Sequence, residues 1–162
     1  MKRLLTITVA LLIATFAVAL PAAASPPQDV SGAFTVVSVI PTSIREAGNN
    51  CIIEADVTFA FTGGIDGAFS SLPLRIVHHG PCDPLGPAPE NFQGHGTFAG
   101  TVNGVAGSFD FNFRGKVDAA GNAEAKLTVR QGSGGLDELH GAITLTGITG
   151  VGGTYEGRVH FD

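Results

Sequence analysis

The densest group of side chains capable of chemistry is His78-His79, followed closely by Cys82-Asp83. Imidazole, thiolate and carboxylate groups at this spacing are ligand types that zinc and other transition metals accept. Successive residues of a β-strand point to opposite faces, however, so His78 and His79 do not readily reach one ion. Cys82 is also expected to be oxidised. We therefore predict no metal site.

Two titratable side chains fall on the apolar, inward phase of the predicted strands: His78, which lies beside Ala55, and Tyr155. An inward histidine can act as a general base or orient a ligand. The alternative is a solvated histidine without a role at the mouth of a barrel. Tyr155 shares the phase of Val159, where a phenol usually packs in the core with its hydroxyl hydrogen-bonded. His78, Tyr155 and Ala55 are thus the candidate ligand-binding residues.

The other reactive residue types form no recognisable catalytic arrangement. His95, His140 and His160 follow the outer, polar phase, and Asp137-Glu138 is expected in a solvated turn. The run Gly132–Gly135 lacks the Lys-Ser/Thr that completes a phosphate-binding loop, and no G-x-S-x-G motif occurs. We predict no catalytic residue and no cofactor.

The first residues have the pattern of an export signal. The basic pair Lys2-Arg3 precedes the apolar run Leu4–Leu20, and Ala22–Ala24 provides small residues for cleavage before Ser25. An N-terminal membrane anchor is the alternative, although a run of about 17 apolar residues is at the lower limit for spanning a bilayer. We expect a secreted or periplasmic protein.

Cleavage would divide the 162 residues into a signal peptide (1–24), a leader (25–31) and a single domain (32–162). Loss of Lys2 and Arg3 leaves seven basic against 14 acidic residues. This acidic balance argues against a nucleic-acid partner, which requires a basic surface. After cleavage we expect no association with a membrane.

The two cysteines fit an exported protein. An oxidising compartment favours a disulfide between Cys51 and Cys82, and two thiols are too few for a structural zinc site unless histidines contribute.

Apolar and polar residues alternate through most of the chain after residue 30. The segment Phe109–Arg114, for example, places its three phenylalanines on one face and its polar residues on the other. This period is typical of antiparallel strands with one buried side. Eight such strands without a helix indicate a sandwich or a small closed barrel. They are expected at about 32–40, 51–64, 69–79, 92–102, 105–116, 122–131, 141–148 and 153–161.

Two turn sequences predict strand register. Asn103-Gly104 is typical of a type I′ hairpin, which places Phe98 opposite Phe109 and keeps apolar residues on one face. Asp66-Gly67 predicts a second hairpin, in which Cys51 lies opposite Cys82. A bulge or an unpaired edge is expected at Pro73.

The segment Gly96–Phe109 resembles the G-x-F-x-G-x-x-x-G-x-x-G-S-F hairpin of a bacterial domain family of unknown function with the allene-oxide-cyclase-like barrel. Leu127–Gly141 is similar to a second element of that family. The resemblance implies an eight-stranded antiparallel barrel with a short helical turn near Leu136–His140. It implies no activity. An export signal, a Pro-rich insertion at Gly80–Glu90 and the cysteine pair distinguish this chain from the family's usual form.

The first functional hypothesis is a non-enzymatic module that binds a small apolar molecule inside the barrel. Small inward residues (Ala55, Gly80, Ala123 and Ala125) would leave volume near His78, and the Gly80–Glu90 loop would cover the mouth. The alternatives are an isomerase- or cyclase-like enzyme acting on a hydrophobic substrate, and a structural or oligomeric surface protein. The oligomeric state is not predicted.

Overall fold

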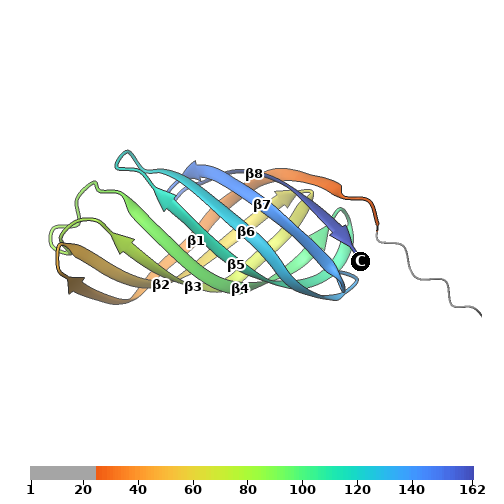
Figure 1. Cartoon of the computed structure of the whole chain (residues 1–162), viewed down its shortest axis with the longest axis horizontal. Coiled ribbons are helices and arrows are strands. Elements are labelled where there is room, and N and C mark those ends of the chain that lie inside the picture. The colour runs from red at the N-terminus through yellow and green to blue at the C-terminus, as the bar shows by residue number, and fades with distance from the viewer. Residues whose placement is uncertain (1–24) are drawn as a thin grey trace, which may run out of the picture.

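Eight antiparallel strands close into a barrel (Figure 1), as the all-β prediction required. The computed structural model describes residues 25–162, so the predicted signal peptide lies outside the described residues. Each strand pairs with its neighbours in sequence, and β1 pairs with β8 to complete the barrel. The strands are β1 (Gln28–Ala47), β2 (Asn50–Gly63), β3 (Ile65–His78), β4 (Glu90–Val102), β5 (Val105–Val117), β6 (Asn122–Gly134), β7 (Leu139–Ile148) and β8 (Gly152–Phe161).

The hairpin of β4 and β5 has the predicted register. Phe98 pairs with Phe109 and Gly96 with Phe111. Asn103 (φ 48°) and Gly104 (φ 81°) both have positive φ, which is the requirement of a type I′ turn. An added Cβ on Gly96 would lie 3.1 Å from the Phe111 ring, so the glycine leaves room for the ring.

The predicted turn at Asp66-Gly67 is wrong. The turn between β2 and β3 falls at Gly63-Gly64, so that Phe61 pairs with Gly67 and Asp66 lies inside β3. Both dipeptides suit a turn locally, and tertiary contacts select the first of them. Relative to the prediction, the partners of β2 move by four residues from Cys51 to Val57 and by five beyond the bulge between Val57 and Phe59. Val57, Phe59 and Phe61 are all buried, so the predicted inward face of β2 is retained.

The predicted helical turn at Leu136–His140 is absent from the described chain. Residues 135–138 form a turn between β6 and β7, flanked by Gly134 (φ 69°) and containing Glu138 (φ 61°). Left-handed residues at these positions prevent a right-handed helix from continuing. Within residues 25–162, no helix has the length and apolar character of a membrane span.

Phenylalanine rings fill the half of the barrel towards the β2–β3 turn. Ring centroids are 4.2 Å apart for Phe69 and Phe111 and 4.7 Å apart for Phe98 and Phe109. The alternate residues Asp110 and Asn112 are exposed. The predicted assignment of inner and outer faces on β5 is therefore confirmed.

The first strand is longer than predicted at both ends. Gln28–Ser31, assigned to the leader from the sequence, belong to β1 and pair with β8. Ser25 is held at the end of β8, because its N–H and its hydroxyl donate to the Phe161 carbonyl at 2.8 and 3.0 Å. The second half of β1 runs past the start of β8 and pairs with β2.

Candidate functional site

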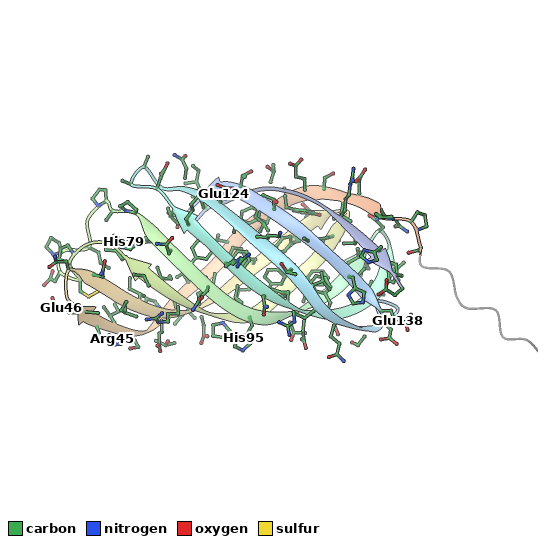
Figure 2. All side chains as sticks on the ribbon, viewed as in Figure 1. Arg45, Glu46, His79, His95, Glu124 and Glu138 are labelled. Carbon is green, nitrogen blue, oxygen red and sulfur yellow. A yellow bond between two sulfur atoms is a disulfide. The ribbon has the colours of Figure 1, made fainter. Side chains whose placement is uncertain are left out.

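An apolar pocket of about 110 Å³ opens at the end of the barrel that carries the β1–β2 turn and the β3–β4 loop. Figure 2 labels Arg45, Glu46 and His79 at this end and Glu138 at the other. Inward side chains from β1 to β7 and the turn before β8 form the walls. The lining consists of Phe34, Val36, Val39, Val57, Phe59, Leu74, Ile76, Glu90, Phe92, Phe113, Val117, Ala123, Ala125, Leu145, Ile148, Thr149 and Gly150.

Small residues on neighbouring strands account for this volume. Ala123 and Ala125 of β6 lie opposite Val117 and Gly115 of β5, and three of these four have little or no side chain. The large rings of the other half of the barrel do not reach this end, since Phe59 and Phe113 already lie at the inner limit of the pocket. Close packing is therefore interrupted here.

Among the described residues that line the pocket, Glu90 is the one with a titratable side chain. Its Oε1 lies 2.9 Å from Nδ1 of His78, directly across the β3–β4 ladder. Nδ1–H donates when Glu90 is ionised, because an ionised carboxylate can only accept. His78 thus fixes the carboxylate at the edge of an otherwise apolar space.

The ring of His78 is inward and buried, with a residue exposure of 3%. It does not line the apolar pocket. Its Nε2 faces Gly80, where an added Cβ would lie 3.0 Å away, and this nitrogen has no hydrogen-bond partner among the described atoms. The β3–β4 loop therefore covers the histidine, and Glu90 stands between His78 and the pocket.

A disulfide fixes this loop to the barrel. Cys51 and Cys82 are bonded, with their Cα atoms 4.9 Å apart, so the predicted bond is present in the structure. The predicted ladder position is wrong, because Cys51 pairs with His78 and Cys82 lies in the loop beyond β3. A further tether is the His79 N–H, which donates to the Pro89 carbonyl at 2.9 Å.

Tyr155 lies at the other end of the barrel and holds the β2–β3 turn. Its hydroxyl accepts the Ile65 N–H at 2.7 Å and lies 3.0 and 3.2 Å from the carbonyls of Ile65 and Thr62. Burial raises the pKa of the phenol above its ordinary value, and the hydrogen bond from Ile65 opposes that shift. These bonds use the hydroxyl fully, as the core-packing interpretation of Tyr155 expected.

The candidate ligand-binding residues are therefore not brought together. His78 pairs with Cys51 at one end of β2, and the Tyr155 hydroxyl lies beside Thr62 at the other end. These two positions on β2 are roughly 35 Å apart at the usual rise per residue. The predicted position of His78 beside Ala55 is wrong, because Ala55 pairs with Leu74 and His78 with Cys51. Ala55 is buried and does not line the apolar pocket.

The remaining sequence candidates lie outside the pocket. His95 is exposed on the outer face (Figure 2). His140 and His160 are half-buried and stack with ring centroids 5.7 Å apart, and their Nε2 atoms lie 3.1 and 3.5 Å from the Asp162 carboxylate. Asp137 and Glu138 are exposed in their turn.

Sequence reasoning missed Glu90. The strand was expected to begin at residue 92, and the preceding Pro-rich run was interpreted as a loop throughout. The sequence did hold one signal: Glu90 is two residues before Phe92, so the two side chains point to the same, inward face of the strand. Its pairing with His78 follows from the β3–β4 register, for which the sequence offers no short turn.

The geometry defines a class of protein: an eight-stranded antiparallel barrel with one ring-filled half and one open apolar end. Residues 30–158 match the family described as "Protein of unknown function (DUF3224)", and the chain belongs to this family. The predicted resemblance to a family of unknown function is thereby confirmed. No comparison tests the likeness to allene oxide cyclases, which stays a prediction.

A solved structure supports the fold. The crystal structure of a DUF3224 protein of unknown function from Shewanella oneidensis MR-1 is similar over 85% of this chain and 99% of that chain, with a TM-score of 0.67 and 18% sequence identity. At that identity the likeness shows the fold alone. No curated protein matches this chain.

Proposed function

We propose that this protein is an exported, non-enzymatic binding module that holds a small apolar molecule, or the apolar end of one, in the open mouth of its barrel. The observation that supports this most directly is the pocket itself, whose walls come from seven strands and are almost entirely hydrocarbon. Ligand sites are typically concave, mostly apolar and provided with few polar groups.

The size of the pocket limits the guest. About 110 Å³ is slightly smaller than the engineered cavity of about 150 Å³ that binds benzene. A single ring or a short alkyl segment would fit, and a longer molecule would extend through the mouth. Glu90, held by His78, would accept a hydrogen bond from a hydroxyl or amine of the guest and so fix its orientation.

Export is part of the proposal, and the disulfide supports it. Disulfides persist in oxidising compartments and are rare where thiols are kept reduced. The Cys51–Cys82 bond joins the loop over His78 to β2. An oxidising environment would therefore also maintain the position of this loop at the end of the barrel.

We infer binding rather than an isomerase- or cyclase-like reaction because acid–base chemistry usually needs a donor and an acceptor that both reach the substrate. Here Glu90 reaches the pocket, while His78 is covered by the loop and Tyr155 is at the far end.

An NMR titration with benzene tests the proposal. Wild-type protein with labelled methyl groups should show saturable shifts at Leu145 and Val117, which line the pocket. Ala123→Leu fills the pocket from its half-buried edge and should abolish these shifts. Ala99→Leu makes the same change on the exposed face of β4 and should leave them intact. Absence of saturable shifts in wild type, or equal shifts in Ala123→Leu, would contradict the proposal.

A further inference from the structure

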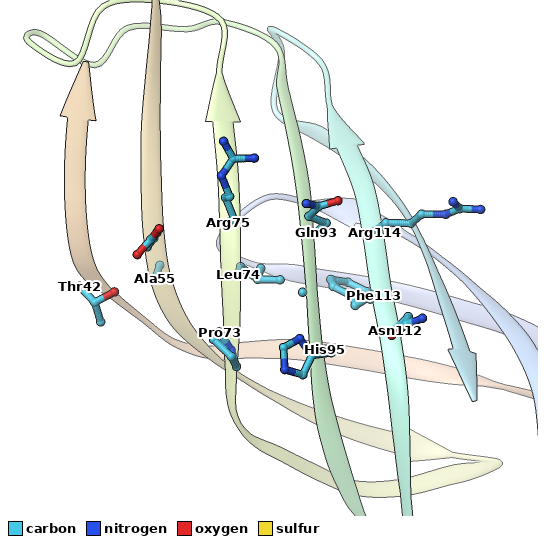
Figure 3. A pocket seen from close by; sticks show the side chains of 12 residues that line it. Thr42, Ala55, Pro73, Leu74, Arg75, Gln93, His95, Asn112, Phe113 and Arg114 are labelled. Atoms are coloured by element: carbon cyan, nitrogen blue, oxygen red, sulfur yellow. The ribbon is translucent and has the colours of Figure 1, made fainter. Parts of the chain in front are cut away.

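A second hollow lies on the outside of the barrel, on a different face from the apolar pocket. It extends across β1 to β5 and has a volume of about 550 Å³ (Figure 3). Ala55, Leu74 and Phe113 lie at its floor, and most of the exposed side chains that line it are polar. We refer to this hollow as the outer groove.

A register shift in the β3–β4 ladder accompanies the groove. Phe69 pairs with Phe98, and the next pair is Leu74 with Gly94. Four residues of β3 therefore face three residues of β4, and Pro73, which has no N–H, is among them. The ladder is therefore irregular beside Pro73, which lines the groove.

Four polar side chains form a row across the groove. Ladder pairing places Glu54 beside Arg75, Arg75 beside Gln93 and Gln93 beside Arg114. Figure 3 shows Arg75, Gln93 and Arg114 on three adjacent strands, with His95 and Asn112 in the next row. Arginine, glutamine and asparagine present planar donor groups, so the groove is rich in directed hydrogen-bond donors.

The two arginines are not neutralised by ion pairs within the described part of the chain. Lys116 and Arg158, by contrast, pair with Glu124 and Asp29 at 3.2 and 3.0 Å. Two guanidinium groups without an ion pair thus lie on β3 and β5, on either side of Gln93, in a protein whose formal net charge is −5. A guanidinium group binds a carboxylate through two parallel hydrogen bonds, so each arginine is suited to one carboxylate.

From this arrangement we infer that the outer groove binds an acidic oligosaccharide, with Arg75 and Arg114 each holding a carboxylate and Gln93, His95 and Asn112 contacting sugar hydroxyls. The two arginines are two strands apart, which is roughly 10 Å at the usual strand spacing. In a chain of uronic acids, the carboxylates of alternate units lie at a comparable interval. The inference is independent of the proposed function, because the apolar pocket lies on the inner side of the sheet.

Isothermal titration calorimetry with trigalacturonate at low ionic strength, on the full mature protein, tests the inference. Wild type should bind, and Arg75→Gln/Arg114→Gln should bind at least about tenfold more weakly, equivalent to the loss of about 1.4 kcal/mol. The matched control is Arg45→Gln/Arg158→Gln, which removes the same charge from exposed positions that do not line the groove and should retain wild-type affinity. The neutral trisaccharide maltotriose should not bind.

Three results would overturn the inference: no binding of trigalacturonate by wild type, equal weakening in both double variants, or comparable binding of maltotriose. Circular dichroism of each variant verifies folding. All four arginines are exposed, so the fold should persist.

Discussion

Replacing Tyr155 by phenylalanine removes one oxygen atom from the buried end of the barrel. The ring should keep its place, since its centroid lies 5.5 Å from that of Phe61 and the residue is 3% exposed. The Ile65 N–H and the Ile65 carbonyl would lose their partner. The change therefore isolates the hydrogen bonds from the packing.

The expected cost follows from those lost bonds. An unsatisfied buried polar group costs about 1–3 kcal/mol, and Ile65 is itself buried. We expect Tyr155→Phe to lower the free energy of unfolding by about 2–3 kcal/mol. The matched control is Thr97→Val, which removes the exposed hydrogen bond to Asp110 and should cost less than about 1 kcal/mol.

Urea unfolding of the two variants beside wild type measures these costs. A loss below about 0.5 kcal/mol for Tyr155→Phe would refute the reasoning, since it would mean that water or a shifted turn satisfies Ile65. A loss equal to that of Thr97→Val would refute it as well.

The same phenol predicts a dependence on pH. Because burial raises its pKa above the ordinary value near 10, the unfolded state releases the proton first as the pH rises. The stability due to the neutral phenol is therefore complete below about pH 10 and is lost as the pH approaches the folded-state pKa. Wild type should lose stability relative to Tyr155→Phe in this range. The chain has one tyrosine and no tryptophan, so phenolate absorbance reports this group directly, and a midpoint at or below 10 would contradict the prediction.

Three further predictions concern the core, the disulfide and the processed chain. Phe111→Ala should cost about 3–5 kcal/mol in urea unfolding, as for large core truncations, and a cost below about 1 kcal/mol would exclude its packing against Phe69. Reduction of Cys51–Cys82, which closes a loop with a sequence separation of 31, should lower the unfolding free energy by about 3–4 kcal/mol in the chain-entropy account, and two free thiols in unreduced, denatured protein would disprove the bond. Exported protein should begin at Ser25 by N-terminal sequencing, whereas an intact Met1 in a membrane fraction would favour the anchor.

Local turn chemistry explains where sequence reasoning succeeded. Asn103-Gly104 accepts two left-handed residues at little cost, so the register of β4 and β5 followed from a short segment of chain. The alternation of apolar and polar residues then fixed which face was buried.

The choice between Gly63-Gly64 and Asp66-Gly67 could not be made in this way. Tyr155, which is 90 positions away from Ile65 in sequence, selects the first turn through its hydroxyl. The position of Gly67 within β3 depends on the neighbouring strand β4, because an added Cβ would meet the backbone of Gly100. Contacts of this kind exist only after the barrel has closed.

The candidate site was predictable in outline and not in detail. The sequence predicted volume beside four small inward residues; Ala123 and Ala125 line the pocket, whereas Ala55 and Gly80 do not. The ion pair of His78 with Glu90 depends on how the loop returns the chain to β4. Turn signals do not determine the register across such a long loop, so the carboxylate at the pocket could be found only in the structure.

The central claim is that the barrel mouth accepts an apolar guest. A crystal of the mature protein under xenon pressure tests it most directly, because xenon enters apolar cavities without hydrogen bonds. We predict a xenon site bounded by Phe92, Phe113, Ala125 and Leu145, and its loss in Ala123→Leu. Ordered side chains or water filling this space, with no xenon bound, would contradict the account.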